Sequence, residues 1–268
     1  MLAPSPVVKK IAKEALTKDF SKSIVVCSIL IFVFSIATLV GSIVLVYAHT
    51  VGYIIAVALL LFFAVCPLFL GVLSYFRRLI FEQNDSVLVI FKYFSSVSEY
   101  KRALHFAFLI AIRLISVALV LYLPCIIVWV LSNEEIYSFF DISLPLWTSN
   151  LWVLNSFLAF IASLALVFVM LKYYLAPFVF VSNDTLDPAE AVNMSNIISK
   201  RTGADFFGLA LSFAGWILLS FLVAPLIFTL PYFIASYGVH CRFAITAYNR
   251  DVDRFNANVT PSFSTDEI

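Results

Sequence analysis

Long uninterrupted runs of apolar residues dominate the chain and predict its fold. Residues 205–242 hold two such runs, joined at Ala224 and Pro225, with no charged residue between Asp205 and His240. Each is long enough to cross a bilayer as a helix. Runs this continuous lack the apolar–polar alternation of a membrane β-barrel, and in lipid only a helix or a closed barrel pairs all backbone polar groups. The pattern therefore predicts a helical membrane protein.

Four further apolar runs precede this pair, at residues 23–48, 51–76, 103–131 and 151–181. Only His49 and Thr50 separate the first two, so we expect an antiparallel hairpin there. The predicted fold class is all-α, a polytopic bundle of six transmembrane helices. Residues 23–248 would form this six-span membrane domain.

Shorter amphipathic segments flank the predicted spans. Residues 1–22 form a basic N-terminal segment, which would either lie on an anionic membrane surface as an interfacial helix or be a solvated lead-in. A second cytoplasmic interfacial helix is predicted at 86–98. A third begins at Asp187, Pro188 and Glu190, which suit an N-cap and first turn, and leads toward Gly203. Residues 249–268 are polar without an apolar period, which predicts a disordered tail.

Composition and charge narrow the class and fix an orientation. With 63% hydrophobic and 12% charged residues, the chain is not a water-soluble globule. The balance of 17 basic and 16 acidic residues argues against a nucleic-acid partner. Lys and Arg gather before span 1, between spans 2 and 3, between spans 4 and 5 and after span 6, so both termini are predicted in the cytoplasm. The acidic, aromatic segment 132–150 suits the outer interface.

No catalytic or metal motif stands out. The chain has no HExxH pair, no GxSxG elbow and no phosphate-binding glycine loop. Its four cysteines lie far apart within apolar runs, as small buried hydrophobes do. The sequence thus predicts a protein that is not an enzyme and has no metal and no cofactor.

Small residues recur near the start of span 5 and indicate helix packing. The stripe comprises Ala204, Gly208, Ser212 and Gly215, with Trp216 next to it. Small residues at intervals of four let another helix approach closely. The stripe would serve either the contact between spans 5 and 6 or a homodimer face.

Two intramembrane cations are the clearest candidates for binding. Arg113 lies about ten residues, or about 15 Å, beyond the start of span 3, deeper than a side chain easily snorkels. Lys172 lies at a similar depth in span 4. In one interpretation Arg113 pairs with Asp205 or with freed carbonyls, and Lys172 reaches the headgroups. In the other, Arg113, Lys172 and Arg242 line an inward-facing pocket for a lipid phosphate or another anion.

The last third of the chain resembles a known family. The resemblance rests on Ala189-Glu190-Ala191, Ser195, Lys200, Phe206-Phe207, the run LSFAGW at 211–216 and Pro231-Tyr232. These residues are similar to the bacterial multi-pass membrane family called domain of unknown function 975. Where that family tends to show Met-Lys-Gly, this chain has Ser199-Lys200-Arg201. The resemblance implies a helical fold in the bacterial cytoplasmic (plasma) membrane and brings no activity.

The leading functional hypothesis is a non-enzymatic scaffold or accessory protein. It would engage anionic lipid, a membrane-protein partner or a second copy through its basic cytoplasmic face. The alternative is a small transporter or permease subunit whose helices are broken around a substrate path by Pro67, Pro124, Pro177 and Pro231. A third possibility is an immunity or stress-response protein.

Overall fold

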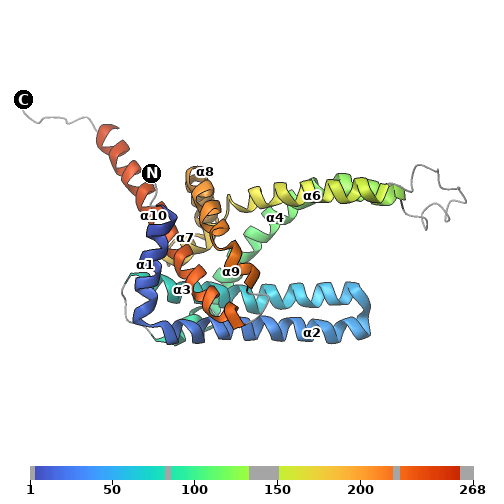
Figure 1. Cartoon of the computed structure of the whole chain (residues 1–268), viewed down its shortest axis with the longest axis horizontal. Helices are drawn as coiled ribbons and strands as arrows, with labels where there is room; N and C mark the ends of the chain where they lie inside the picture. Colours follow the sequence, from blue (N-terminus) through green and yellow to red (C-terminus); the bar gives the residue numbers. More distant parts are fainter. Residues whose placement is uncertain (1–3, 82–85, 133–150, 220–223, 260–268) are drawn as a thin grey trace, which may run out of the picture.

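The protein is built of helices, and two long hairpins project from a compact body (Figure 1). The computed structural model describes residues 4–81, 86–132, 151–219 and 224–259, and these residues contain no strand. Both hairpins leave the body on the same side, whereas α1 and the end of α10 lie toward the opposite side (Figure 1). The predicted all-α class is confirmed.

The first hairpin is formed by α2, Phe20–Leu60, which reverses direction within its own length. A Cβ on Gly41 would overlap the side chain of Val57, although a straight helix would separate these residues by about 24 Å. The second arm continues through a π-helical turn, η1 (Leu61–Val65), into α3 (Cys66–Ile80). Pro67 cannot donate to the carbonyl of Phe63, and the Tyr100 hydroxyl donates to that carbonyl instead, at 2.9 Å.

The second hairpin pairs α4, Val97–Ser132, with α6, Leu151–Met170. A hydrogen bond of 2.6 Å joins the hydroxyls of Tyr122 and Ser163 across it. Large apolar side chains on both helices point outward: Val120 is 72% exposed and Phe160 67%. So much apolar surface is unfavourable in water and suits contact with lipid.

Four helices of the described residues are long and apolar enough to cross a membrane. They are Phe20–Leu45, Gly52–Ile80, Val97–Ser132 and Leu151–Met170. These match the first four predicted spans, and the predicted turn at His49 and Thr50 falls between the first two. The predicted outer loop at 132–150 lies, apart from Ser132, outside the described residues.

The body contains the core, and it collects helices from the whole chain. Its elements besides α3 are α1 (Ser5–Lys18), the 3-10 helix η2 (Val87–Phe94), α7 (Ala176–Ser182), α8 (Pro188–Leu211), α9 (Ala214–Leu219) and α10 (Ala224–Val259). Phe180 of α7 lies at the centre, stacked on Phe106 at 4.4 Å and on Tyr93 at 5.9 Å between ring centroids. The guanidinium of Arg102 covers the same ring, 4.6 Å from its centroid.

The first two predicted interfacial segments pack into the body. Val8, Ala12 and Leu16 on the apolar face of α1 are buried in the core, so protein covers this face instead of lipid. The segment predicted as a helix at 86–98 forms a 3-10 helix, and its Ile90 and Tyr93 are buried.

The later elements depart from the predicted spans in three ways. The predicted span 151–181 stops at Met170, and α7 follows after turns at 171–175. The predicted helix toward Gly203 does start at Pro188 but continues through Gly203 to Leu211, so residues 205–242 are divided among α8, α9 and α10. The predicted polar tail is helical as far as Val259.

Candidate functional site

Hydroxyl groups from α8 and α10 donate hydrogen bonds to backbone carbonyls at the break between α6 and α7. Pro177 lies in the first turn of α7, where it lacks an N–H and crowds the preceding carbonyls. Ser195 and Ser199 of α8 both donate to the carbonyl of Lys172, at 3.2 and 2.8 Å. Tyr237 of α10 donates to the carbonyl of Tyr174 at 2.6 Å. Backbone groups freed by the break therefore have partners, as buried polar groups require.

A chain of hydrogen bonds runs from α8 through Tyr174 to α10. The Thr202 hydroxyl donates to the Ile198 carbonyl at 3.1 Å, so its one proton is used there. The Tyr174 hydroxyl makes hydrogen bonds with the Thr202 hydroxyl at 2.7 Å and with Nε2 of His240 at 3.0 Å. The side chain of His240 is only 2% exposed, and the chain of bonds joins three elements inside the body.

A ring of aromatic groups closes around this chain. Phe206 stacks on Tyr174 with ring centroids 4.2 Å apart and planes 9° apart. It also approaches His240 at 5.7 Å and Tyr237 at 5.8 Å. The polar groups are thus enclosed by rings and exchange hydrogen bonds with one another, an arrangement that fixes α8 against α10.

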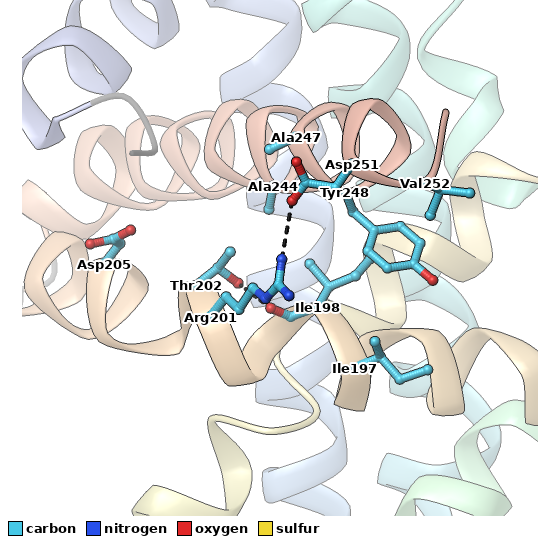
Figure 2. A pocket seen from close by; sticks show the side chains of 10 residues that line it. All are labelled: Ile197, Ile198, Arg201, Thr202, Asp205, Ala244, Ala247, Tyr248, Asp251 and Val252. Carbon is cyan, nitrogen blue, oxygen red and sulfur yellow. Dashed lines mark hydrogen bonds and ion pairs between the residues drawn. The ribbon is translucent and has the colours of Figure 1, made fainter. Parts of the chain in front are cut away.

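A pocket opens on the solvent side of this cluster, between α8 and α10 (Figure 2). Its volume is about 660 Å³, and Thr202 lies on its wall. Arg201 and Asp251 form an ion pair of 3.1 Å across it (Figure 2). Their side chains are 81% and 56% exposed, so the pair contributes only about 0–1 kcal/mol. The pocket therefore sits between helices that the buried cluster, and not this ion pair, holds together.

The three predicted anion-binding residues contact different groups in the structure. Arg113 of α4 donates to the side-chain oxygen of Asn193 in α8 at 3.1 Å. Lys172 lies in the turns before α7 with an exposed side chain. Arg242 of α10 instead donates to the carbonyl of Ile80 at 3.3 Å, and its guanidinium covers the Phe81 ring at 4.5 Å. Of the three, Arg242 alone is among the described residues that line the 420 Å³ recess described below, and the predicted three-cation pocket stays a prediction.

The sequence suggested Asp205 as a partner for Arg113. In the structure the Arg113 guanidinium donates to Asn193 instead. Asp205 is exposed on α8 and lines the pocket of Figure 2. Among the described residues, no ion pair joins Asp205 to Arg113.

The stripe of small residues faces outward. A Cβ on Gly208 or on Gly215 would meet no heavy atom within 4 Å, and Ala204 and Ser212 are exposed. Among the described residues the Cβ positions of both glycines therefore face open space, and the predicted contact between spans 5 and 6 stays a prediction. Trp216 is 54% exposed and lines an apolar groove with residues of α1 and α10.

Arg242 belongs to a recess that we call the inner recess. It has a volume of about 420 Å³ and is lined by residues of α1, α3 and α10: Ile11, Glu14, Ala15, Lys18, Leu79, Ile80, Phe81 and Arg242. Arg77 lies near it, with its guanidinium 5.9 Å from the Phe81 ring. Sequence reasoning found Arg242 but missed Lys18, although the position of Lys18 just before the first apolar run was an available signal.

Within the described residues, no group of three or more His, Cys, Asp or Glu side chains could hold a metal ion. The four cysteines are free thiols.

Near the start of α8, Asp184 accepts a hydrogen bond of 2.6 Å from Lys92. Partial burial would raise the pKa of the Asp184 carboxyl, but Lys92, Arg102 and Arg77 outweigh that effect and lower it.

The fold and these features define an all-helical protein with four helices suited to crossing a membrane and a body rich in buried polar contacts. A family model described as "Protein of unknown function (DUF975)" matches residues 1–244, and the chain belongs to this family. No curated protein and no solved structure matches the chain.

Proposed function

We propose that this protein is a non-enzymatic membrane scaffold or accessory protein that binds anionic phospholipid at its inner face. The observation that carries the proposal is the inner recess. Lys18 and Arg242 both line it, where α1 and α10 pack beside the end of α3.

The inner recess lies at the level expected for lipid headgroups. Lys18 is two residues before the first candidate span, which begins at Phe20, and Ile80 is the last residue of the second. A membrane crossed by these two helices would therefore begin at the recess. Phosphates of the inner leaflet would face it without leaving the bilayer.

The charges of the inner recess suit a phosphate group. Among the described lining residues, Lys18 and Arg242 contribute two cations and Glu14 one carboxylate, and Arg77 adds a third cation nearby. Among the described residues Arg242 makes one hydrogen bond, a long one of 3.3 Å, and its side chain is exposed, so most of its donors remain available to an incoming oxygen. A guanidinium presents two parallel donors to a phosphate, which favours a defined binding geometry.

The same proposal includes the orientation of the molecule. Six spans with both termini in the cytoplasm of a bacterium would place the basic body inside and the hairpin tips outside. The position of α1 and of the end of α10 on one side of the body supports this orientation (Figure 1). The end of α8 together with α9 would supply the fifth span, and the first half of α10 the sixth.

A scaffold fits these observations better than a transporter. The recesses described above are lined by α1, α3, α8 and α10 of the body, whereas a transporter needs a hydrated path between its spans. Two of the four prolines do not interrupt a helix, because α4 continues through Pro124 and α10 through Pro231. The outward stripe at Gly208 and Gly215 supports contact with a second copy or a partner helix.

Native mass spectrometry tests the proposal. The purified protein in mild detergent is compared with and without phosphatidylglycerol, and phosphatidylcholine is the neutral control. We expect wild type to retain one phosphatidylglycerol and Arg242→Gln to lose it, while Arg250→Gln, an equal charge change elsewhere on α10, keeps it. The double variant Arg113→Leu, Lys172→Leu should also keep it.

Two results would contradict the proposal. Equal retention of both lipids would indicate nonspecific solvation. Loss of phosphatidylglycerol in the Arg113, Lys172 variant alone would place the lipid site at those two residues instead of the inner recess. The same spectra report the mass of any dimer.

A further inference from the structure

An apolar groove lies beside α1, on the side opposite the inner recess. Its volume is about 530 Å³, within the range of about 300–1,000 Å³ typical of small-ligand pockets. Its walls come from α1, the start of α2, α9 and α10, and the rings of Phe20 and Phe228 stack along it at 6.2 Å. Lys13 and Leu16 line this groove, whereas Glu14 and Lys18 line the inner recess. The two sites therefore use different faces of α1.

Two polar features distinguish this groove from an ordinary apolar surface. Thr229 lines it and is 6% exposed, and its buried hydroxyl has no hydrogen-bond partner among the residues that the structure describes. A buried hydroxyl without a partner is costly and points to a missing polar group. At the rim, Lys13 provides one exposed cation.

From these features we infer that the groove binds a long-chain carboxylate, an amphiphile with one acyl chain and one negative charge. The single ammonium of Lys13 matches one anionic head, and the apolar walls match one chain. A head oxygen close to the groove floor supplies the acceptor that the Thr229 hydroxyl lacks. Phe20 begins the first candidate span, so the groove opens where membrane amphiphiles are concentrated. This inference does not depend on the phospholipid proposed for the inner recess.

Trp216 on the groove wall provides a direct readout. Replacing Trp129, Trp147 and Trp152 by Phe leaves Trp216 as the only tryptophan of the chain. Titration with 9,10-dibromostearate in mild detergent should quench Trp216 in a saturable manner. A matched protein that retains only Trp152 of the second hairpin, 68% exposed, reports how much probe enters the micelle.

Substitutions at the rim and floor locate the ligand. We expect Lys13→Gln to weaken quenching of Trp216 about tenfold, as loss of a charge-assisted bond does. Lys13→Arg should preserve it. Lys10→Gln is the control, because Lys10 is an exposed lysine of the same helix that does not line the groove. Thr229→Val keeps the shape and should weaken binding severalfold without lowering the unfolding temperature.

Several outcomes would overturn the inference. Quenching of Trp216 that follows Trp152 in parallel would mean simple micelle partition. If Lys13→Gln or Thr229→Val bound dibromostearate with the affinity of the unsubstituted protein, the carboxylate head would not lie in the groove. Stronger quenching by dibrominated phosphatidylglycerol would assign the groove to the chain of a membrane phospholipid.

Discussion

Gly71 and Gly208 are both helical glycines, but only Gly208 has room for a methyl group. A Cβ on Gly71 would overlap the backbone carbonyl of Ile90 in η2, which cannot move like the end of a side chain. A Cβ on Gly208 would meet no atom within 4 Å. The same substitution at the two positions therefore separates packing from helix propensity.

We predict that Gly71→Ala lowers the free energy of unfolding by about 1–3 kcal/mol, the usual cost of overpacking. Gly208→Ala should be neutral or stabilising by up to about 1 kcal/mol, because alanine favours the helix. Unfolding midpoints in the same detergent measure both. Equal shifts in the two variants would mean that α3 and η2 do not approach as closely as described.

Single residues also mark how far the sequence could be used for prediction. The charge of Arg113 correctly indicated a need for a partner, but its partner Asn193 is 80 positions away and uncharged. Charge pairing favoured Asp205, which lies three helical turns beyond Asn193 on α8. Only the packing of α4 on α8 selects between them, and no local pattern encodes that packing.

At the scale of elements, the break between α6 and α7 depends on groups that are far away in the sequence. Pro177 removes a backbone donor, but Ser195, Ser199 and Tyr237 provide the replacement donors. Proline alone does not break a membrane helix here, since α4 continues through Pro124. The break is therefore a property of three elements together.

The double substitution Ser195→Ala, Ser199→Ala tests this dependence. Both residues are buried, and the variant leaves the Lys172 carbonyl without these donors. We predict a loss of about 1–3 kcal/mol, the cost of an unsatisfied buried group. The control is Ser156→Ala, since Ser156 bonds only within α6, and it should stay within about 0.5 kcal/mol. Equal effects of the two variants would show that the break needs no such support.

The elements that the sequence predicted well are those with local signals. Apolar runs located the two hairpins, and the Asp187 side chain caps α8 at the Ala189 N–H, 3.0 Å away, as its N-cap pattern indicated. The sequence missed the body, because the apolar face of α1 fits core and lipid equally well. It also missed the inner recess, which needs α1, α3 and α10 to meet, and the groove, which needs α1, α2, α9 and α10.

At the scale of the whole molecule, charge and apolar surface divide along one axis. The body carries most of the described Lys and Arg side chains, while the hairpins present apolar side chains such as Val120 and Phe160. Because cytoplasmic loops are enriched in Lys and Arg, this division favours a body inside the cell. The segment from α8 to α10 is less simple, since its apolar residues are shared among three helices.

Labelling of single cysteines decides how that segment crosses the membrane. In a protein whose four native cysteines are alanines, one cysteine is placed at Lys10, Thr50 or Ser220. We predict that a membrane-impermeant maleimide labels the Thr50 and Ser220 positions in intact cells and the Lys10 position only after permeabilisation. Labelling of Thr50 alone would leave α9 and α10 on the inner side as a body resting on four spans. Labelling of Lys10 alone would invert the orientation, and phosphates of the inner leaflet would then lie at the wrong end of the molecule to reach Lys18 and Arg242.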